Sequence, residues 1–483
     1  MLFLLPMDHI NKRAIIIHGK KITTPFNLEL NGSDALLECL ELLRFVPGKR
    51  AVLLSRWHGK LVVAKLFLAF FKAGIYAKKE IAGKKMLDSA NIATAEIVYS
   101  GSTIEGRIKV VIFEYIHPSK MLSDVLLSDQ DSNRYHEYLK KLVKLIARFH
   151  EAGIIHSDLH LDNFLVKEKI LYAIDGSSMK KGNMGFPLGT KKSLRNLAVI
   201  FAQLNIQDMA LLKELVDIYF SVRFLKSKER SELFLKKSID KRRRIVSKGY
   251  LKKNYRESTE TVCRKSFSSF VLCKRDHYTK FMESFLGNPD IAFDSPEMIM
   301  LKNGNSTTVV RLTVDGMDLV IKRYNAKNIF RGFRHAFKKS YADRSWGAAH
   351  YLINNGIKTA RPIAMKEMRI GPFRGKSYLV CEYIDGINAL DYFIDPAFKD
   401  KKIMAQKVVG IFNQLELLRV RHGDMKATNI LIYYNNPYLI DLDSMVIYKN
   451  NVLSNRAHRK DVDRFMRNWS EHPKIKKMFS PLS

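Results

Sequence analysis

The sequence is short of cysteine. Its 483 residues include four cysteines, Cys39, Cys263, Cys273 and Cys381, and no two of them form a Cys-x-x-Cys pair. Four cysteines are too few for a disulfide framework, and without a paired spacing they do not indicate a structural zinc site. We therefore expect a chain that works in a reducing compartment.

Long apolar segments are also missing. The longest apolar run, 61–77, is interrupted by Lys65 and Lys72 and falls short of the ~20 residues that a membrane-spanning helix needs. The apolar stretch from Met1 to Leu5 is too short for the core of a signal peptide, and no basic region precedes it. These absences predict a cytosolic chain without a transmembrane segment.

Acidic residues are few compared with basic ones. The chain has 48 Asp plus Glu against 82 Lys plus Arg, a formal net charge of +34. Hydrophobic residues make up 46% and charged residues 27%, which excludes a disordered chain, and the length is typical of two or three domains. The charge indicates an anionic partner, whether a nucleic acid, an anionic membrane surface or a phosphorylated substrate.

What the sequence does contain is an internal repeat. Residues 156–163 read HSDLHLDN and residues 422–429 read HGDMKATN, and each segment is followed, twelve residues after its Asn, by Asp175 or Asp441. The offset between these positions is 266 residues throughout. Two upstream matches have nearly the same offset: 113–116 with 381–384, and 92–95 with 357–360. A collinear series of this kind indicates a duplicated domain.

Each copy shows the same order of predicted elements, with strands and one helix followed by a mostly helical half, so the fold class is α+β. In the first copy we expect strands at 51–54, 61–67 and 109–115 and helices at 75–89 and 138–149. In the second copy we expect strands at 308–314, 318–324 and 377–383 and helices at 341–354 and 404–418.

The segment between the copies, 209–290, is predicted to be helical and is very basic. Its most basic part, 236–256, contains only one acidic residue, Asp240. Turn-forming residues at 287–290 and 295–296 mark a boundary. We therefore expect domains at 1–290, with the basic helices as a C-terminal extension of the first copy, and at 291–483.

The repeated motif is suited to metal-assisted phosphoryl transfer. In such a reaction one carboxylate receives or orients the proton of an attacking hydroxyl, while an amide oxygen and a second carboxylate hold Mg²⁺ against the nucleotide phosphates. The spacing from Asp to Asn resembles that of the protein-kinase catalytic loop. A single occurrence could be a solvated turn, but two occurrences in a duplicated context favour the catalytic interpretation.

Phosphate binding also needs a cation on an upstream strand. Lys65 in 62–67 and Lys322 in 319–324 resemble the lysine of the kinase Val-Ala-Ile-Lys strand. Glu80 on the following helix is the expected partner of Lys65, whereas the second copy has Ser345 at the equivalent place and Asp343 as the only nearby acid. Neither copy contains Gly-x-Gly-x-x-Gly, so the turns at 46–50 and 302–308 are either phosphate-binding or ordinary turns.

Together, the strand lysine and the segments 356–362, 377–384, 422–429 and 438–443 resemble the lipopolysaccharide kinase (Kdo/WaaP) family of Gram-negative bacteria. The second copy matches almost throughout, and the first matches more loosely over about residues 45–205. The resemblance implies two protein-kinase-like bilobal domains in tandem. It also implies that ATP and Mg²⁺ are used to phosphorylate sugars of the lipopolysaccharide inner core, with the protein peripheral at the cytoplasmic face of the inner membrane.

The resemblance also assigns roles to residues of both copies. It implies Asp158 and Asp424 as catalytic bases, and Lys426 as a cation that neutralises the transferring phosphate, where the first copy has His160. The remaining assignments are Asn163, Asp175, Asn429 and Asp441 as metal ligands, Lys65 and Lys322 with Glu80 for phosphate binding, and Glu114, Tyr115, Glu382 and Tyr383 in the adenine-binding hinge.

Three alternatives remain. A protein kinase is disfavoured because fewer than twenty residues separate Asp175 from 193–196, a similar gap follows Asp441, and neither contains Ala-Pro-Glu. A kinase-like scaffold would have one or both copies inactive. A nucleic-acid-binding protein would explain the charge, but the chain has no zinc-finger spacing, no aromatic-interleaved strand motif and no basic heptad helix.

We therefore favour a tandem kinase acting on a phosphate-bearing glycolipid and expect no specific nucleic-acid partner. The basic helices at 226–256 would contact either the anionic membrane or the substrate's phosphates.

Overall fold

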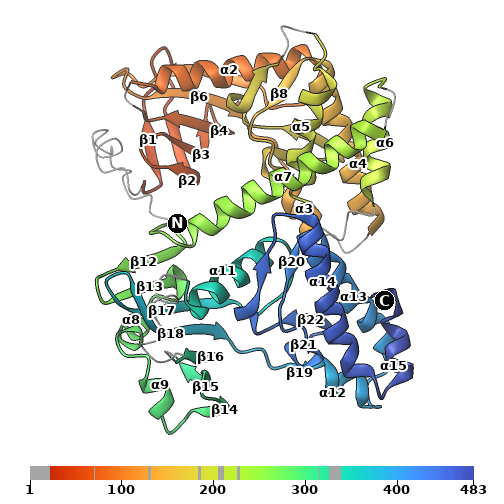
Figure 1. Ribbon diagram of the computed structural model, residues 1–483. Helices are drawn as coiled ribbons and strands as arrows, with labels where there is room; N and C mark the ends of the chain where they lie inside the picture. The colour runs from red at the N-terminus through yellow and green to blue at the C-terminus, as the bar shows by residue number, and fades with distance from the viewer. Residues whose placement is uncertain are drawn as a thin grey trace. The chain divides into compact units, whose positions relative to one another are not determined.

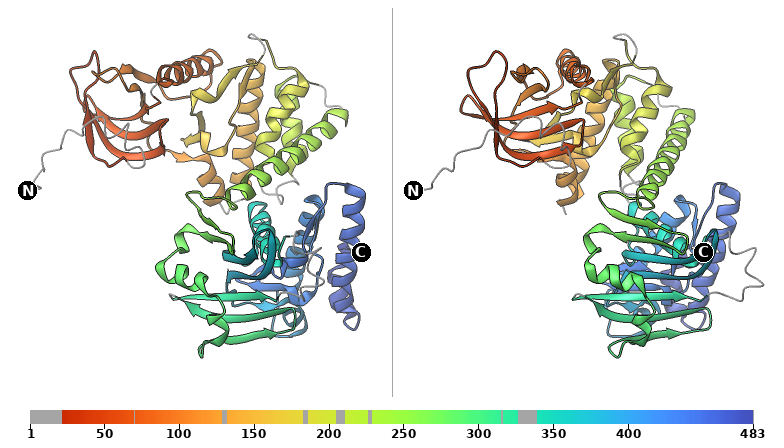
Figure 2. Two further views of the ribbon diagram at one scale, coloured as in Figure 1. Left: turned by 60° about the vertical axis from the view of Figure 1, so that its left-hand side comes forward. Right: turned by 90° about the vertical axis from the view of Figure 1, so that its left-hand side faces the viewer.

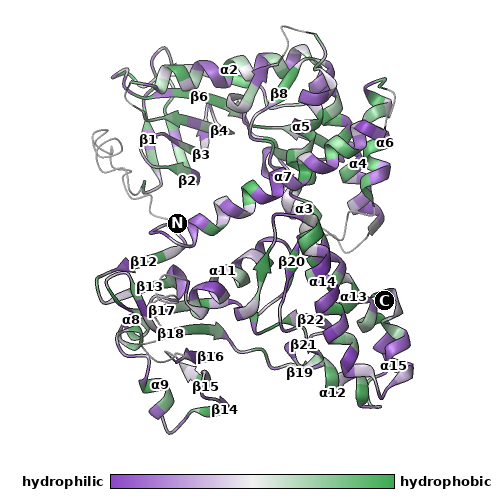
Figure 3. Cartoon of the chain, viewed as in Figure 1, coloured by the Kyte–Doolittle hydropathy of each residue, from purple (hydrophilic) through white to green (hydrophobic). Residues whose placement is uncertain are grey.

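The computed structural model describes residues 22–482 apart from 70, 129–131, 183–185, 205–210, 226–228, 315 and 326–338. The chain forms two compact units (Figure 1). The first ends at Arg242 and the second begins at Arg243, so the division falls within helix α7 (Glu229–Lys253). Figure 3 shows that α7 carries hydrophilic and hydrophobic residues along its length.

Each unit contains an antiparallel sheet with the same core of five strands (Figure 2). In the first unit the order is β1-β2-β3-β4-β6-β5, and in the second it is β12-β13-β17-β18-β16-β15-β14. The order β2-β3-β4-β6-β5 therefore recurs as β14-β15-β16-β18-β17. The strands of the first sheet are β1 (Phe26–Leu28), β2 (Leu37–Val46), β3 (Arg50–Trp57), β4 (Lys60–Phe67), β5 (Ile97–Ser102) and β6 (Lys109–Glu114). Those of the second are β12 (Thr261–Lys265), β13 (Ser269–Lys274), β14 (Ile299–Asn303), β15 (Thr307–Val314), β16 (Met317–Tyr324), β17 (Pro362–Ile370) and β18 (Phe373–Glu382).

A helix follows the third core strand in each unit, and a mostly helical region follows the sheet. The first unit has α2 (Ala73–Ser89), α3 (Leu122–Ser128), α4 (Ser132–Glu151), α5 (Thr190–Phe201), α6 (Leu212–Val222) and the start of α7. The second has α11 (Tyr341–Asn354), α12 (Ala389–Ile394), α13 (Lys401–Leu417), α14 (Asn451–Met466) and α15 (Pro473–Met478). All the strands and helices expected in the two copies are confirmed. Among the described helices, none is both long and apolar enough to cross a membrane.

Periodic apolar residues place these elements. On α4, Leu139, Leu142 and Ile146 recur at helical spacing and are at most 1% exposed. They pack in one cluster with Leu235 and Ile239 of α7. Burial of this face, at about 25 cal/mol per Å², stabilises the helical region of the first unit.

The division between the compact units, at 242/243, differs from the domain boundary expected at 290/291. The helix ends at Lys253, and β12 and β13 join the second sheet, where Leu272 lies opposite Met365 of β17. The indole N–H of the buried Trp346 on α11 donates to the backbone oxygen of Asn254, at 3.2 Å. Residues 243–290 therefore belong to the second unit. The expectation that 209–290 is helical throughout was therefore wrong at β12 and β13. The excess of basic residues ends near Arg256, and residues 266–268, between the two strands, form the turn of a hairpin.

Candidate active site

In the second unit the loop predicted to be catalytic, called the catalytic loop below, lies between β20 (Val420–Arg421) and β21 (Ile430–Tyr433). The side-chain N–H of Asn429 donates to the backbone oxygen of Asp424, at 2.7 Å. This bond uses the amide nitrogen and leaves the amide oxygen of Asn429 for another partner. The N–H of Ile440, which follows β22 (Asn436–Leu439), donates to the backbone oxygen of Asn429 at 3.0 Å. Asp441 is therefore held next to Asn429.

The first unit repeats these bonds. Asn163 donates from its side chain to the backbone oxygen of Asp158, at 2.6 Å, and Ile174 donates to the backbone oxygen of Asn163, at 2.9 Å. Asp175 and Asp441 both have left-handed backbones, with φ of 69° and 61°. This conformation is uncommon for residues other than glycine, although Asp is enriched in it. The two copies therefore share the backbone geometry of the motif as well as its spacing.

A cavity of about 320 Å³ lies between the sheet and the catalytic loop of the second unit. It brings together five of the predicted site residues: Lys322, Glu382, Tyr383, Asn429 and Asp441. Much of the remaining lining is apolar and includes Val309, Val320, Leu379, Ile384, Leu431 and Ile440. The cavity thus has apolar walls and, around Lys322 and Asp441, a charged end.

The charged end of the cavity contains an ion pair. The Nζ of Lys322 lies 3.1 Å from Oδ1 of Asp441. Burial alone would lower the pKa of Lys322, but Tyr324 and Asp441 outweigh burial and raise it. Burial would raise the pKa of Asp441, but Lys322 lowers it below its usual value. Burial and the neighbouring Asp441 together raise the pKa of Asp443. At neutral pH, Lys322 is therefore cationic and Asp441 is ionised.

The first unit holds its lysine differently, as expected from the sequence. The Nζ of Lys65 lies 2.5 Å from Oε1 of Glu80, and this glutamate also accepts hydrogen bonds from the backbone N–H groups of Gly176 and Ser177, at 3.0 and 3.3 Å. Glu80 therefore ties α2 to both the lysine strand and the segment after Asp175.

Among the residues described in the second unit, no side chain of α11 makes an equivalent tie to Lys322. Ser345 lies 3.3 Å from the hydroxyl of Tyr324. Asp343 accepts from the hydroxyl of Tyr255, at 2.5 Å, and pairs with Lys339, at 3.0 Å. The departure from the kinase pattern that the sequence indicated is therefore present in the contacts of α11.

The two predicted bases differ in their surroundings. The carboxylate of Asp424 pairs with Arg464 of α14 and lies 3.4 Å from Nζ of Lys426. The side chain of Asp158 is 57% exposed and lies 3.7 Å from Nε2 of His160. Neither Asp424 nor Lys426 is among the residues that line the cavity.

The first unit's hinge residues follow the same register as those of the second. Glu114 ends β6 opposite Val62 of β4, as Glu382 ends β18 opposite Leu319 of β16. Tyr115 stacks on His117, with ring centroids 5.2 Å apart. The two copies therefore place these predicted hinge residues at the same position in the sheet.

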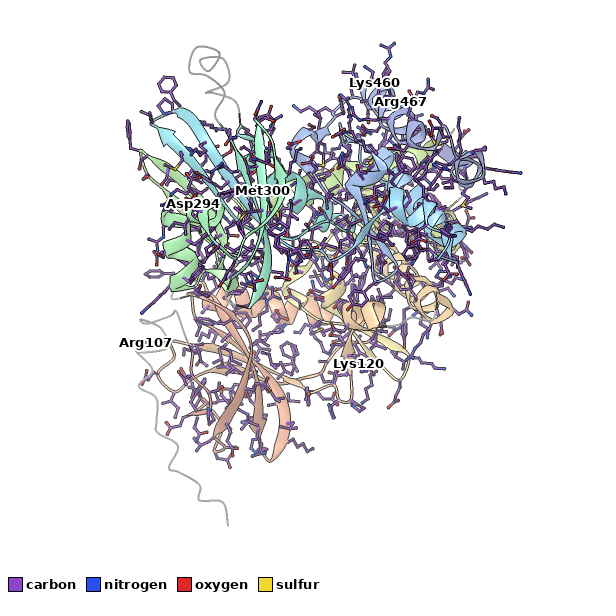
Figure 4. All side chains as sticks on the ribbon, turned by 90° about the horizontal axis from the view of Figure 1, so that it is seen from below. Arg107, Lys120, Asp294, Met300, Lys460 and Arg467 are labelled. Carbon is purple, nitrogen blue, oxygen red and sulfur yellow. The ribbon has the colours of Figure 1, made fainter. Side chains whose placement is uncertain are left out.

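The sequence did not identify two residues of α14 as part of the site. Arg464 pairs with Asp424, and the buried carboxylate of Asp461 accepts from the backbone N–H groups of His422 and Gly423, at 2.6 and 3.1 Å. In the first unit, Asn196 instead donates to the backbone oxygen of His156, at 2.9 Å. Asp461 is four residues from the buried Ala457 and from the buried Phe465, so it lies on the apolar face of α14. An acidic residue on that face was the feature of the sequence that could have identified Asp461. Figure 4 shows Lys460 and Arg467, which are exposed residues near the same end of the chain.

The oxygen atoms present in the second unit fit a hard divalent cation. Among the described residues there is no group of three or more His, Cys, Asp or Glu that could form a metal site alone. The amide oxygen of Asn429 and the ionised carboxylate of Asp441 are donors that Mg²⁺ accepts, usually together with phosphate oxygens and water. In the first unit, Asp175 already accepts from Ser177 and Ser178, at 2.6 and 3.2 Å, and lies 3.5 Å from Arg50. The carboxylate of Asp175 therefore has more hydrogen-bond and ion-pair partners among the described residues than the carboxylate of Asp441 has.

Close packing of α2 on the segment after Asp175 gives a testable prediction. A Cβ added at Gly83 would lie 1.8 Å from the backbone oxygen of Gly176. We expect Gly83→Ala to destabilise the first unit by about 1–3 kcal/mol, because backbone atoms must move. Gly74, in the same helix, has no atom within 4 Å of an added Cβ, so Gly74→Ala should be neutral or stabilising by up to about 1 kcal/mol. Chemical denaturation of both variants measures the difference, and equal stabilities would contradict it.

With the site described, comparisons with known proteins can be placed beside it. The model of the lipopolysaccharide kinase (Kdo/WaaP) family matches residues 49–182 and 301–478, more than half of the chain. A search of curated proteins found no match. The structure of "WaaP in complex with acyl carrier protein" is similar at 16% sequence identity and a TM-score of 0.33, over 42% of this chain and 88% of that chain. On the evidence of the family model, the chain belongs to the lipopolysaccharide kinase (Kdo/WaaP) family.

Proposed function

We propose that the second unit is an ATP-dependent kinase domain that phosphorylates a sugar hydroxyl of lipopolysaccharide core or of a related anionic glycolipid. Both units are then protein-kinase-like bilobal domains, dividing within α7. The observation that carries the proposal is the cavity in which Lys322, Asn429 and Asp441 meet the hinge residues Glu382 and Tyr383. Family membership implies the use of ATP and, usually, of a divalent metal ion.

Each residue then has a role. The backbone at Glu382 and Tyr383 binds the adenine edge, and Lys322 pairs with the α- and β-phosphates. Asn429 and Asp441 would hold Mg²⁺, which neutralises charge on the phosphates. Asp424 receives the proton of the attacking hydroxyl, and Lys426 stabilises negative charge on the transferred phosphoryl group.

The short segment after Asp441 supports a sugar acceptor over a peptide. Only η6 (Leu442–Ser444) and β23 (Val446–Ile447) lie between Asp441 and the start of α14 at Asn451. A protein kinase needs an extended segment here on which the substrate peptide lies. A sugar hydroxyl needs only access to Asp424.

The proposal places the protein at the cytoplasmic face of the inner membrane, held peripherally by its charge. The net charge of +34 is suited to an anionic surface and to an acceptor that carries phosphate groups. We propose that the first unit supports this activity and that the second unit performs the transfer.

The decisive experiment is transfer of the γ-phosphate of labelled ATP by the purified full chain. Lipopolysaccharide core, free core oligosaccharide and a generic protein substrate are offered separately. Labelling of the lipopolysaccharide or oligosaccharide is the expected result. Labelling of protein alone would support the protein-kinase alternative, and absence of transfer to any acceptor would contradict the proposal.

Lys322→Met should weaken binding of ATP with Mg²⁺ by roughly tenfold to a hundredfold, because a charge-assisted hydrogen bond is worth about 1.5–3 kcal/mol. Isothermal titration calorimetry on the full chain measures the change. Lys65→Met is the matched control in the first unit, and its effect on the site of the second unit should be small. Equal affinity of the wild-type and Lys322→Met proteins would exclude Lys322 from phosphate binding.

A further inference from the structure

Two hairpin turns of the second sheet form one apolar tip. Phe267, in the turn between β12 and β13, is 75% exposed, and Ile370, at the end of β17, is 72% exposed. Ile370 lies opposite Phe373, which is 37% exposed. Isolated exposed apolar side chains are common on proteins, but a group of them at adjacent turns is not.

The tip is held in place by its backbone. The N–H of Arg369 donates to the oxygen of Ser268, at 2.8 Å, and the N–H of Gly371 donates to the oxygen of Phe267, at 2.9 Å. The ring of Phe267 lies over Gly371, where an added Cβ would be 3.1 Å from the ring. The two turns therefore present Phe267 and Ile370 as one ordered surface.

Cationic side chains surround this tip. Lys265 is exposed, and its Nζ lies 5.3 Å from the ring centroid of Phe270; the guanidinium of Arg369 lies 4.5 Å from the same centroid. Arg374, which lies opposite Arg369, shares the carboxylate of Glu367 with it, and that glutamate is fully buried. The exposed face of the tip is therefore apolar. Its border has one exposed cation, Lys265, and two arginines that pair with Glu367 and keep 20% and 23% of their side-chain surface exposed.

The register of the sheet relates this tip to the cavity. Thr307 lies opposite Tyr324, which lies opposite Ser377. The turn before Thr307 and the turn before Phe373 are therefore at the same end of the sheet, and Glu382 of the hinge is at the other end of β18. A surface bound by the tip would therefore lie at the same end of the sheet as the β14–β15 turn. Thr307, which follows that turn, lines the cavity.

We propose that this tip inserts Phe267 and Ile370 into the interface of an anionic lipid bilayer, with Lys265, Arg369 and Arg374 at the level of the headgroups. Aromatic and aliphatic side chains bordered by Lys and Arg have the composition of interfacial membrane anchors. The inference rests on the proposed function, because it brings the second unit to a glycolipid acceptor.

The basic segment 236–256, most of it in α7, offers exposed charge for the same role. Its exposed cations are Lys236, Lys237, Lys241, Arg244, Lys248, Lys252, Lys253 and Arg256. Arg243, by contrast, is 8% exposed, and Arg243 and Arg244 both interact with other residues of the protein. What distinguishes the tip is its pair of exposed apolar side chains, Phe267 and Ile370, beside the exposed Lys265.

The test is sedimentation of the full chain with vesicles of phosphatidylcholine alone or of phosphatidylcholine with about 30% phosphatidylglycerol, an anionic lipid that attracts basic residues. We expect binding to the anionic vesicles and a reduction of at least about tenfold in the double variant Phe267→Ser, Ile370→Ser. Phe224→Ser is the matched control, because Phe224 is 92% exposed in the first unit. It should bind as the wild type does.

Two further measurements separate the outcomes. The double variant should keep its melting temperature and its ATP affinity, so a loss of vesicle binding is not a loss of folding or of the kinase site. Unchanged vesicle binding of the double variant, or no binding by the wild type, would overturn the inference while leaving the phosphotransfer assay unaffected. A change from dimer to monomer in sedimentation equilibrium would instead identify the tip as a contact between copies of the chain and would also overturn it.

Discussion

The variant Asp424→Asn should transfer phosphate about a thousandfold more slowly than the wild type. General-base catalysis contributes about 10²–10⁴ to rate, and Asn cannot receive the proton of the acceptor hydroxyl. Asn has nearly the same volume as Asp, and the backbone oxygen of residue 424, which accepts from Asn429, is unchanged. ATP binding should therefore be retained while kcat falls.

Asp158→Asn is the matched control for this experiment, because Asp158 has the same place in the first unit. If the second unit performs the transfer, Asp158→Asn should keep most of the activity. Single-turnover measurement of transfer from labelled ATP to lipopolysaccharide core distinguishes chemistry from product release. A thousandfold loss in Asp158→Asn, with full activity in Asp424→Asn, would assign the reaction to the first unit.

Acid should unfold the protein through its buried histidines. Burial lowers the pKa of His150 and of His156 to about 4 and the pKa of His350 to about 3. All three are at most 2% exposed. Between pH 6.5 and 4 the unfolded chain therefore binds protons that the folded chain does not, so stability falls as the pH falls. With 1.36 kcal/mol per pKa unit, each histidine costs about 3 kcal/mol by pH 4.

His350→Leu tests this dependence in the second unit. Leucine has a similar volume and no proton to bind, so the stability of the unit should depend less steeply on pH below 6.5. Urea denaturation between pH 7.5 and 4.5 measures the slope, and His58→Leu, at an exposed residue, should leave it unchanged. An unaltered slope in His350→Leu would mean that carboxylates alone set the acid transition.

The repeat explains why much of the site could be predicted. A constant offset of 266 residues paired Asp158 with Asp424 and Asn163 with Asn429. In each copy the Asn side chain donates to the backbone oxygen of the Asp. Strand-period apolar patterns around Lys65 and Lys322 placed both lysines on the third core strand. Local pattern and repetition agree at these positions, and such agreement is informative.

The sequence did not predict which residues meet across long separations. The pairing of β13 with β17 joins residues about a hundred positions apart, and nothing in the sequence of either strand indicates which strand it pairs with. Arg464 was missed for the same reason, because a surface arginine on a helix has no feature that points to Asp424. Tertiary contacts, such as the hydrogen bond from Trp346 to Asn254, determine that residues 243–290 belong to the second unit.

The two sheets extend their common core at opposite edges, and this bears on misfolding. In the first unit β1 covers the edge at β2, while in the second unit β13 and β12 cover the edge at β17. A chain with two related sheets can exchange strands between them while folding, since equivalent strands offer similar partners. Because each sheet has its own additional strands, an exchanged strand would leave a neighbour unpaired and its hydrogen bonds unmade. The unequal edges therefore favour correct pairing over strand exchange between the repeats.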